Sequence, residues 1–313
     1  MTQFSPSIED ICRNFFAASA DQFPIASAGD EFYYFPQVTS QQRDWSCWDN
    51  FSEDAVYSFS KRLAGYERDL DAFQHHHKDA VQEDLETQID LSFLKNTVTT
   101  LREQLIEVRT WEKQPTFHLS IACIGIAEAL ESDDPSAGVA RAETLPSFID
   151  NAMASLKDMP VLFRDLGLSM LAEAKRNFLS LAAQLPTLKI ALQRLEVFED
   201  FLRRTKTLPD FRLSEGLVEK IVRDHLNCRL DIPSIQFILD TEIQDMQAVL
   251  NKQAAAIGRD ASWEDVIERI PMPKVPAGGL VAMYRDQVMQ LAKHCLASGF
   301  LSERDVSCCP VRV

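Results

Sequence analysis

Three consecutive histidines, His75, His76 and His77, are the most direct candidates for metal chemistry in this sequence. A zinc site needs its imidazoles to converge on one ion. Neighbouring positions on a helix point about 100° apart, so three in a row do not converge unless the helix unwinds. We therefore expect a solvent-exposed histidine cluster, with these three residues as weak metal candidates only.

The adjacent thiols of Cys308 and Cys309 suggest a vicinal redox pair or a soft-metal site. A disulfide between neighbouring residues is strained, and the other cysteines have no Cys-X-X-Cys spacing. We interpret the pair as two thiols on a C-terminal tail, which predicts sensitivity to oxidation. The chain has seven cysteines, and the other five are scattered, which indicates reduced thiols in a cytoplasmic protein.

Two single histidines, His118 and His225, have polar neighbours and are candidate general bases, although a lone histidine is more often structural. The sequence has no nucleophile elbow, phosphate-binding loop or dinucleotide fingerprint. A helical zinc peptidase needs two histidines one turn apart with a glutamate between them. No histidine here is followed by Glu, and no two are separated by three residues. We therefore assign no catalytic residue and no metal or cofactor site to this chain.

The elements that carry these residues are expected to be helices. Apolar residues recur every three or four positions, which is typical of one buried helix face. Four such stripes run from Leu91 to Val108, Leu188 to Leu202, Ile235 to Ile257 and Leu280 to Cys295. Pro233 and Gly258 are a favourable start and end for the longest. The sequence predicts an all-α fold, a multi-helix array or bundle.

The first 50 residues differ from the rest because aromatic residues crowd an otherwise irregular stretch. We predict that residues 1–50 wrap onto the helical body or onto a partner. Residues 51–313 are expected to form the helical domain, with a candidate break near 131–138. The candidate interface residues are Phe32, Tyr33, Tyr34, Phe35, Trp45, Trp48, Phe300, Cys308 and Cys309.

The composition excludes some classes of partner. The chain has 313 residues, with 47 acidic and 32 basic side chains and a formal net charge of −15. This balance argues against a general nucleic-acid binder, which needs Lys and Arg to displace phosphate counterions. It also argues against docking on an anionic membrane. The start has no positively charged segment followed by an apolar stretch, so we expect a cytoplasmic protein.

A set of dispersed segments carries a family resemblance over residues 50–313. The segments are Asp84–Asp90, Gln114–His118, Leu145–Ala152, Leu213–Ile221, Leu230–Ser234, Glu242–Met246, Ser262–Val266, Gly279–Arg285 and Cys309–Val313. Their order resembles the N-terminal half of a large uncharacterised bacterial family of all-helical, zinc-metallopeptidase-like proteins. Within it, Leu145–Ala152 resembles a proline-containing helix start. The family's His-Glu-Gly-X-Pro-Gly-His-His segment and downstream glutamate have no matching position here.

The resemblance leads to three hypotheses about function. The first is a non-catalytic helical subunit or cleft wall that acts with a protein partner, either a complementary half or a second copy. The second is half of a split zinc metallopeptidase, with zinc held only by a separate partner. The third is a helical protein that binds a small molecule between its helices.

Overall fold

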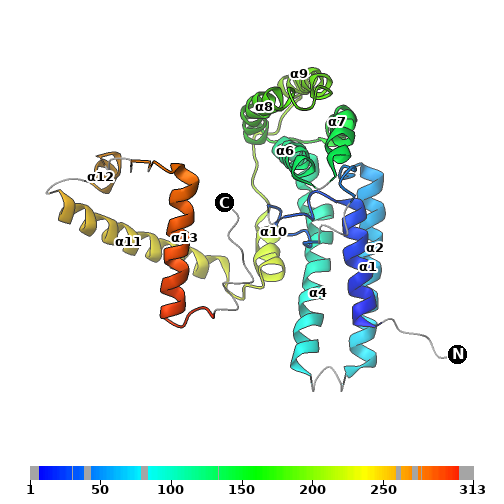
Figure 1. The fold of residues 1–313 in the computed structure, drawn as a ribbon. Helices are drawn as coiled ribbons and strands as arrows, with labels where there is room; N and C mark the ends of the chain where they lie inside the picture. Colours follow the sequence, from blue (N-terminus) through cyan, green and yellow to red (C-terminus); the bar gives the residue numbers. More distant parts are fainter. Residues whose placement is uncertain are drawn as a thin grey trace. The chain divides into compact units, whose positions relative to one another are not determined.

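The described part of the chain has an all-α fold, as predicted (Figure 1). The computed structural model describes residues 7–29, 31–38, 44–78, 84–132, 134–258, 262–269, 274–275 and 277–302. Among them, β structure is limited to one isolated bridge between Pro160 and Leu208. No helix in these ranges is both long and apolar enough to span a membrane.

The chain divides into two compact units, Met1–Ile232 and Pro233–Val313. This division differs from the predicted one, which separated residues 1–50 from the rest and placed a candidate break near 131–138. The polar stretch at that break is short, because one helix ends at Glu131 and the next begins at Pro135. Each unit is described separately below.

Helices of the first unit form two groups. In chain order they are α1 (Ile8–Gln22), α2 (Glu53–His76), α4 (Leu85–Glu103), η2 (Gln104–Val108), α5 (Thr110–Lys113), α6 (Pro115–Glu131), α7 (Pro135–Ser155), α8 (Val161–Leu181), α9 (Leu188–Arg204), α10 (Glu215–Lys220) and η3 (Ile221–His225). Helix α2 packs between α1 and α4, and α6 to α9 pack on one another (Figure 1). The two groups share one hydrophobic core.

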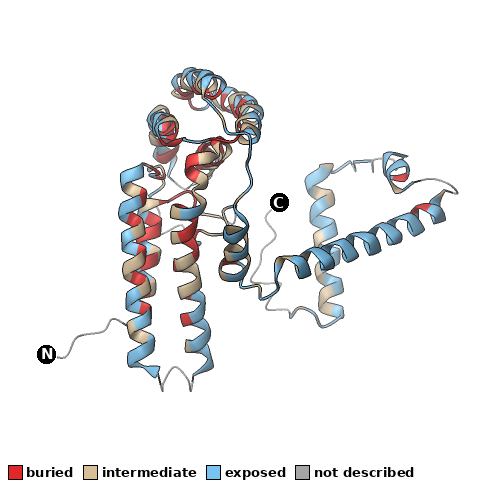
Figure 2. Cartoon of the chain, turned by 180° about the vertical axis from the view of Figure 1, so that it is seen from behind, coloured by how far each residue is buried: buried red, intermediate tan, exposed pale blue. Residues whose placement is uncertain are grey.

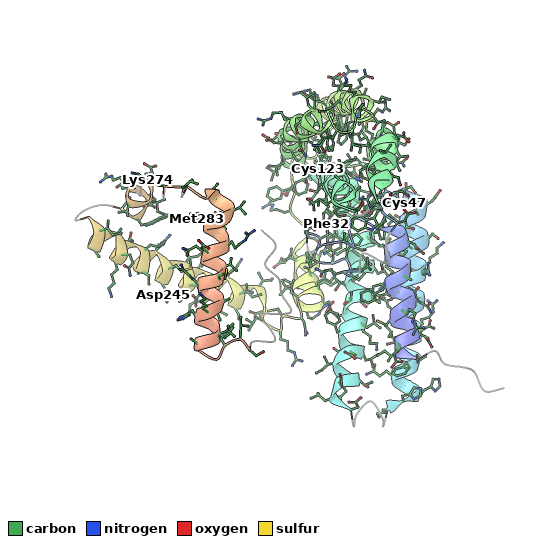
Figure 3. All side chains as sticks on the ribbon, viewed as in Figure 1. Phe32, Cys47, Cys123, Asp245, Lys274 and Met283 are labelled. Carbon is green, nitrogen blue, oxygen red and sulfur yellow. The ribbon has the colours of Figure 1, made fainter. Side chains whose placement is uncertain are left out.

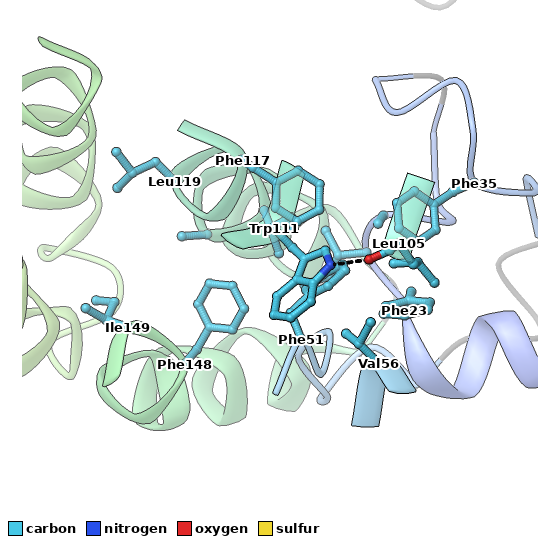
Figure 4. Packing of buried hydrophobic residues seen from close by; sticks show 14 of the residues in the cluster. Phe23, Phe35, Phe51, Val56, Leu105, Trp111, Phe117, Leu119, Phe148 and Ile149 are labelled. Carbon is cyan, nitrogen blue, oxygen red and sulfur yellow. Dashed lines mark hydrogen bonds between the residues drawn. The ribbon is translucent and has the colours of Figure 1, made fainter. Parts of the chain in front are cut away.

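Aromatic residues fill the junction between these two groups (Figure 4). Phe51 stacks on Phe23 with ring centroids 4.7 Å apart, and its ring centroid lies 4.9 Å from that of Phe117. The indole nitrogen of Trp111 donates to the carbonyl of Leu105 at 2.8 Å, so this large side chain is buried with its polar atom satisfied. The junction therefore positions α4 against α5 and α6.

The N-terminal segment is less irregular than predicted, because Ile8–Gln22 form α1. Ser7 caps this helix by accepting from the backbone N–H of Asp10 at 3.1 Å. The stretch from 23 to 52 is without helix where it is described, and its aromatic side chains lie against the helical body. Phe32 is an example, with its ring centroid 5.0 Å from that of Phe117 (Figure 3).

Pro146 does not begin a helix, so that part of the resemblance is wrong. It lies inside α7, where it lacks the N–H for one helical hydrogen bond. The helix begins instead at Pro135, after Asp134 accepts from the N–H of Ser136 at 2.9 Å. An Asp N-cap followed by proline is the stronger start signal.

The second unit contains α11 (Ile232–Ile257), α12 (Trp263–Arg269) and α13 (Gly279–Ala297). Of its described hydrophobic residues, only Ala254 and Val266 are buried (Figure 2). The stripe predicted to face a core is open to solvent, since Leu239, Ile243 and Met246 are exposed by 54%, 52% and 62%. The sequence thus predicted the positions of these helices correctly, but it did not predict that their apolar side chains are exposed.

Candidate functional site

A row of four hydrogen-bonded side chains joins distant parts of the first unit. His225 Nε2 lies 2.8 Å from Glu103 Oε2, and Gln104 Nε2 lies 3.2 Å from His225 Nδ1. The same Gln104 amide donates to the Tyr33 hydroxyl at 2.8 Å. We refer to Glu103, His225, Gln104 and Tyr33 as the polar row.

The directions of these hydrogen bonds define the state of His225. Because the nitrogen of the Gln104 side-chain amide can only donate, His225 Nδ1 accepts. The ring hydrogen is then on Nε2 and is donated to the carboxylate of Glu103. The imidazole is 1% exposed and both of its nitrogens are engaged. His225 therefore holds Glu103 and Gln104 in place in this geometry and is not a free general base.

Lys220 balances the charge of the buried Glu103 carboxylate. Its ammonium lies 2.9 Å from Glu103 Oε1 and 2.8 Å from Glu107 Oε1. Hydrogen bonds from Lys220 to Glu107 and to Glu103 raise the pKa of the lysine. Both oxygens of Glu103 thus have partners, which a buried carboxylate requires.

Two π-helical turns carry this site. The first, η2, begins at Gln104 directly after Glu103, and the second, η3, ends at His225. The Asn96 amide, on α4, donates to the carbonyl of Asp224 and ties η3 to that helix. Single π turns are rare and often occur at functional sites. Their presence on both sides of the His225–Glu103 contact supports a functional role for this region.

A groove opens beside the polar row. One hollow of about 440 Å³ has aromatic walls from Phe16, Tyr33, Tyr34, Phe35 and Phe93, and His225 forms part of its lining. A second hollow of about 550 Å³ is lined mainly by residues of α1 and α4 and shares Phe16 and Phe93 with the first. We call the two together the α1–α4 groove. Hollows of this size are typical of small-ligand sites.

The predicted metal candidates lie away from this groove. His75, His76 and His77 are exposed at the end of α2. The rings of His75 and His76 are 5.7 Å apart, whereas His77 lies against Phe73. Within the described ranges, no three His, Cys, Asp or Glu side chains form a group that could hold a metal ion.

His118 is a structural histidine. Its Nε2 donates to the carbonyl of Trp111 at 2.7 Å, and the ring is buried. Burial lowers the pKa of His118 to about 4, so the ring is neutral at pH 7. It faces Phe51 and Phe148 in the core, not the groove.

The candidate interface residues separate into inward and outward groups. Phe35 is buried, and Phe32 and Tyr34 are partly buried against the core. We predicted that these three residues contact a partner, but in the structure they contact the core of the chain itself. Trp48 Nε1 donates to the carbonyl of Arg141 at 3.2 Å, and the Arg141 guanidinium lies 6.0 Å from the ring centre of Trp45. Tyr33 is exposed, although its ring centroid lies 5.3 Å from that of Tyr34.

Phe300 is 79% exposed and stays a candidate contact residue. Cys308 and Cys309 lie outside the described residues. The sequence drew attention to His225 but not to Glu103, its partner 122 residues away. One signal was available, since Glu103 is a charged residue between Leu101 and Leu105 of a predicted core stripe.

Comparison with known proteins bears on the fold alone. No family model and no curated protein matches the sequence. Among solved structures, a candidate lipoprotein of unknown function from Shewanella oneidensis has a similar fold, with a TM-score of 0.58 and 12% identity. The likeness covers 95% of this chain and 58% of that protein, so this chain spans little more than half of its length.

Proposed function

We propose that this chain is a non-catalytic helical subunit whose second unit binds a partner chain through the apolar faces of α11 and α13. The observation that carries the proposal is the exposure of side chains at core-like spacing. On α11 they are Leu239, Ile243, Met246, Leu250 and Ile257, and on α13 they are Leu280, Tyr284 and Leu291.

Both helices are long, and almost none of their residues is buried. Of the 26 residues in α11 one is buried, and of the 19 in α13 none is. Isolated helices are marginal in water, and contiguous apolar patches of this kind mark interaction surfaces. Covering each large side chain contributes about 1.5–3 kcal/mol. A partner surface would therefore stabilise both helices.

The proposed partner is a complementary chain. This chain spans 58% of the length of its fold neighbour, so a protein of that architecture has further structure that could lie against such faces. The family resemblance favours the same interpretation. A second copy of this chain is the competing occupant, and the mass of the purified assembly distinguishes the two.

The test compares two aspartate substitutions on α11. Ile243→Asp places a charge in the apolar stripe, whereas Thr241→Asp places the same charge on the opposite face. Affinity purification from the native cell should recover a stoichiometric partner with wild type and Thr241→Asp, but not with Ile243→Asp. A strictly monomeric wild type without a partner, or equal recovery with Ile243→Asp, would contradict the proposal.

The second candidate is half of a split zinc metallopeptidase, favoured by the resemblance to a family whose motif lies in its other half. A partner that carries the His-Glu and His-His motif would support it. Mixing that partner with this chain should then give peptide hydrolysis that chelation of zinc abolishes. Binding without hydrolysis favours the non-catalytic subunit.

The cytoplasm is the proposed location of this function. Cys12, Cys47, Cys123, Cys228 and Cys295 are all unpaired in the structure, which suits a reducing compartment. Because the fold neighbour is a candidate lipoprotein, the location of this chain in the cell should be measured directly. Cell fractionation should recover the chain in the cytoplasmic fraction, and recovery with membranes would contradict this assignment.

A further inference from the structure

We propose that the α1–α4 groove binds a small, uncharged amphiphile that has an apolar chain and a hydroxyl, ester or amide head group. This inference is independent of the proposed partner surface, because the groove lies within the first unit and contains no residue of α11 or α13. It rests on the lining of the two hollows and on the polar row.

The α1 end of the groove has an apolar floor with charged residues, Glu9, Arg13 and Asp90, also in its lining. Ile8 and Cys12 from α1 face Leu94 from α4, and Phe16 and Phe93 continue toward the aromatic end. Burial raises the pKa of the Cys12 thiol, which keeps it protonated and weakly polar. Phe93 is 69% exposed, so its ring is accessible to a ligand in the groove.

The opposite end offers hydrogen bonds without a formal charge. The Tyr33 hydroxyl accepts from Gln104, so its own hydrogen is available for a ligand. Burial raises the pKa of Tyr33, which keeps that hydrogen in place at pH 7. The Asn96 amide nitrogen donates to the Asp224 carbonyl, and the Asn96 oxygen accepts from the Thr100 hydroxyl at 3.5 Å, so the second lone pair of that oxygen can accept from a ligand.

The charges around the groove argue for a neutral head group. The described residues that line the aromatic hollow include no Asp, Glu, Lys or Arg. In the apolar hollow, Glu9 and Asp90 are acidic, while Arg13 is paired with Asp10 at 3.0 Å. A carboxylate or phosphate head would therefore find no unpaired cation among these residues, and it would lose its hydration.

The length of the groove favours an elongated ligand. The lining residues on α4 run from Asp90 to Thr100, and ten residues of helix rise about 15 Å. A single molecule that occupies both hollows would contact Phe16 and Phe93, which line both of them. Aromatic side chains at this point suit a flexible alkyl chain.

The test uses three ligands with the same alkyl chain and different head groups, measured by titration calorimetry on the full chain below their aggregation concentrations. Monodecanoylglycerol should bind with one-to-one stoichiometry. Decanoate should bind at least tenfold more weakly, because its carboxylate finds no unpaired cation among the lining residues. Decylamine should also bind more weakly, because the aromatic hollow that receives the head group is lined by no acidic side chain. Equal or tighter binding of either charged ligand would overturn the neutral-head assignment.

Matched variants locate the binding site. Tyr33→Phe removes only the hydroxyl and should weaken monodecanoylglycerol binding by about two- to tenfold, the range for one neutral hydrogen bond. Phe93→Ala should weaken it by about tenfold or more, since a covered Phe contributes apolar burial. Tyr57→Phe on α2 and Phe237→Ala on α11 make the same chemical changes at exposed positions outside the groove and should leave affinity unchanged.

Two results would overturn the inference. One is the absence of monodecanoylglycerol binding to a chain whose circular dichroism is that of the folded protein. The other is undiminished binding to both Tyr33→Phe and Phe93→Ala. Loss of the partner in Ile243→Asp leaves this test unaffected, so failure of the groove and failure of the proposed interface are separate outcomes.

Discussion

Helices α9 and α11 have the same apolar spacing but opposite surroundings. In α9, Leu195 and Phe198 are buried by α7 and α8. In α11, Ile243 and Met246 stand at the same three-residue spacing and are exposed. Apolar periodicity thus indicates that a helix has an apolar face, whereas the burial of that face depends on which elements pack against it. The comparison can therefore be tested by measuring whether the apolar face of each helix contributes to stability.

The largest expected effect is on the free energy of unfolding, and it distinguishes the apolar stripe of α9 from that of α11. Leu195→Ala should lower the free energy of unfolding by about 2–5 kcal/mol, because it leaves a cavity in the core. Leu239→Ala, the same truncation on α11, should change it by less than about 0.5 kcal/mol in the isolated chain. Urea denaturation followed by far-ultraviolet circular dichroism measures both. Equal destabilisation would mean that α11 is already packed in solution.

A smaller effect concerns the polar row. Glu103→Gln retains an oxygen for the His225 N–H but loses the charge that faces Lys220, so stability should fall by about 1–3 kcal/mol. Glu107→Gln, a change at the more exposed partner of the same lysine, should cost less than about 0.5 kcal/mol. Thermal unfolding of both variants at pH 7 checks the prediction. Similar losses would show that Glu103 is more solvated than the structure indicates.

The sequence predicted local structure better than long-range contacts. It located α4, α9, α11 and α13 from spacing, and Gly258 and Ser262 mark helix limits where the structure places them. It missed α1, whose face from Ile11 to Ala18 lies in a stretch dominated by aromatic residues. Because helix formation is local, its signals lie within a few residues of one another.

The candidate site could not be predicted in the same way. His225 comes from the π turn η3 and Glu103 from the end of α4, 122 residues away, and Tyr33 comes from a third segment. No spacing rule relates such residues, because tertiary packing alone brings them together. The same holds for Asp49, which is buried where it accepts from the N–H groups of Ile25 and Ala26 at 2.7 and 2.9 Å.

The smallest effects concern two buried titratable groups whose contributions oppose each other. Burial lowers the pKa of His118 from 6.5 to about 4, so the unfolded chain binds more protons in this window and stability falls as pH falls through it. Burial raises the pKa of Asp49 from 3.8 to about 7, outweighing its two N–H donors and Arg141. Its contribution is complete below about pH 3.8 and is lost as pH rises toward about 7.

Removing His118 and removing Asp49 should therefore change the pH dependence of the melting temperature in opposite directions. Between about pH 6.5 and about pH 4.5, the melting temperature of His118→Gln should rise relative to wild type, because the variant no longer resists protonation. That of Asp49→Asn should fall relative to wild type over the same interval. Differential scanning fluorimetry at matched ionic strength measures both slopes. The double variant should return close to the wild-type slope, whereas parallel slopes in the single variants would mean that one group is hydrated in the folded protein.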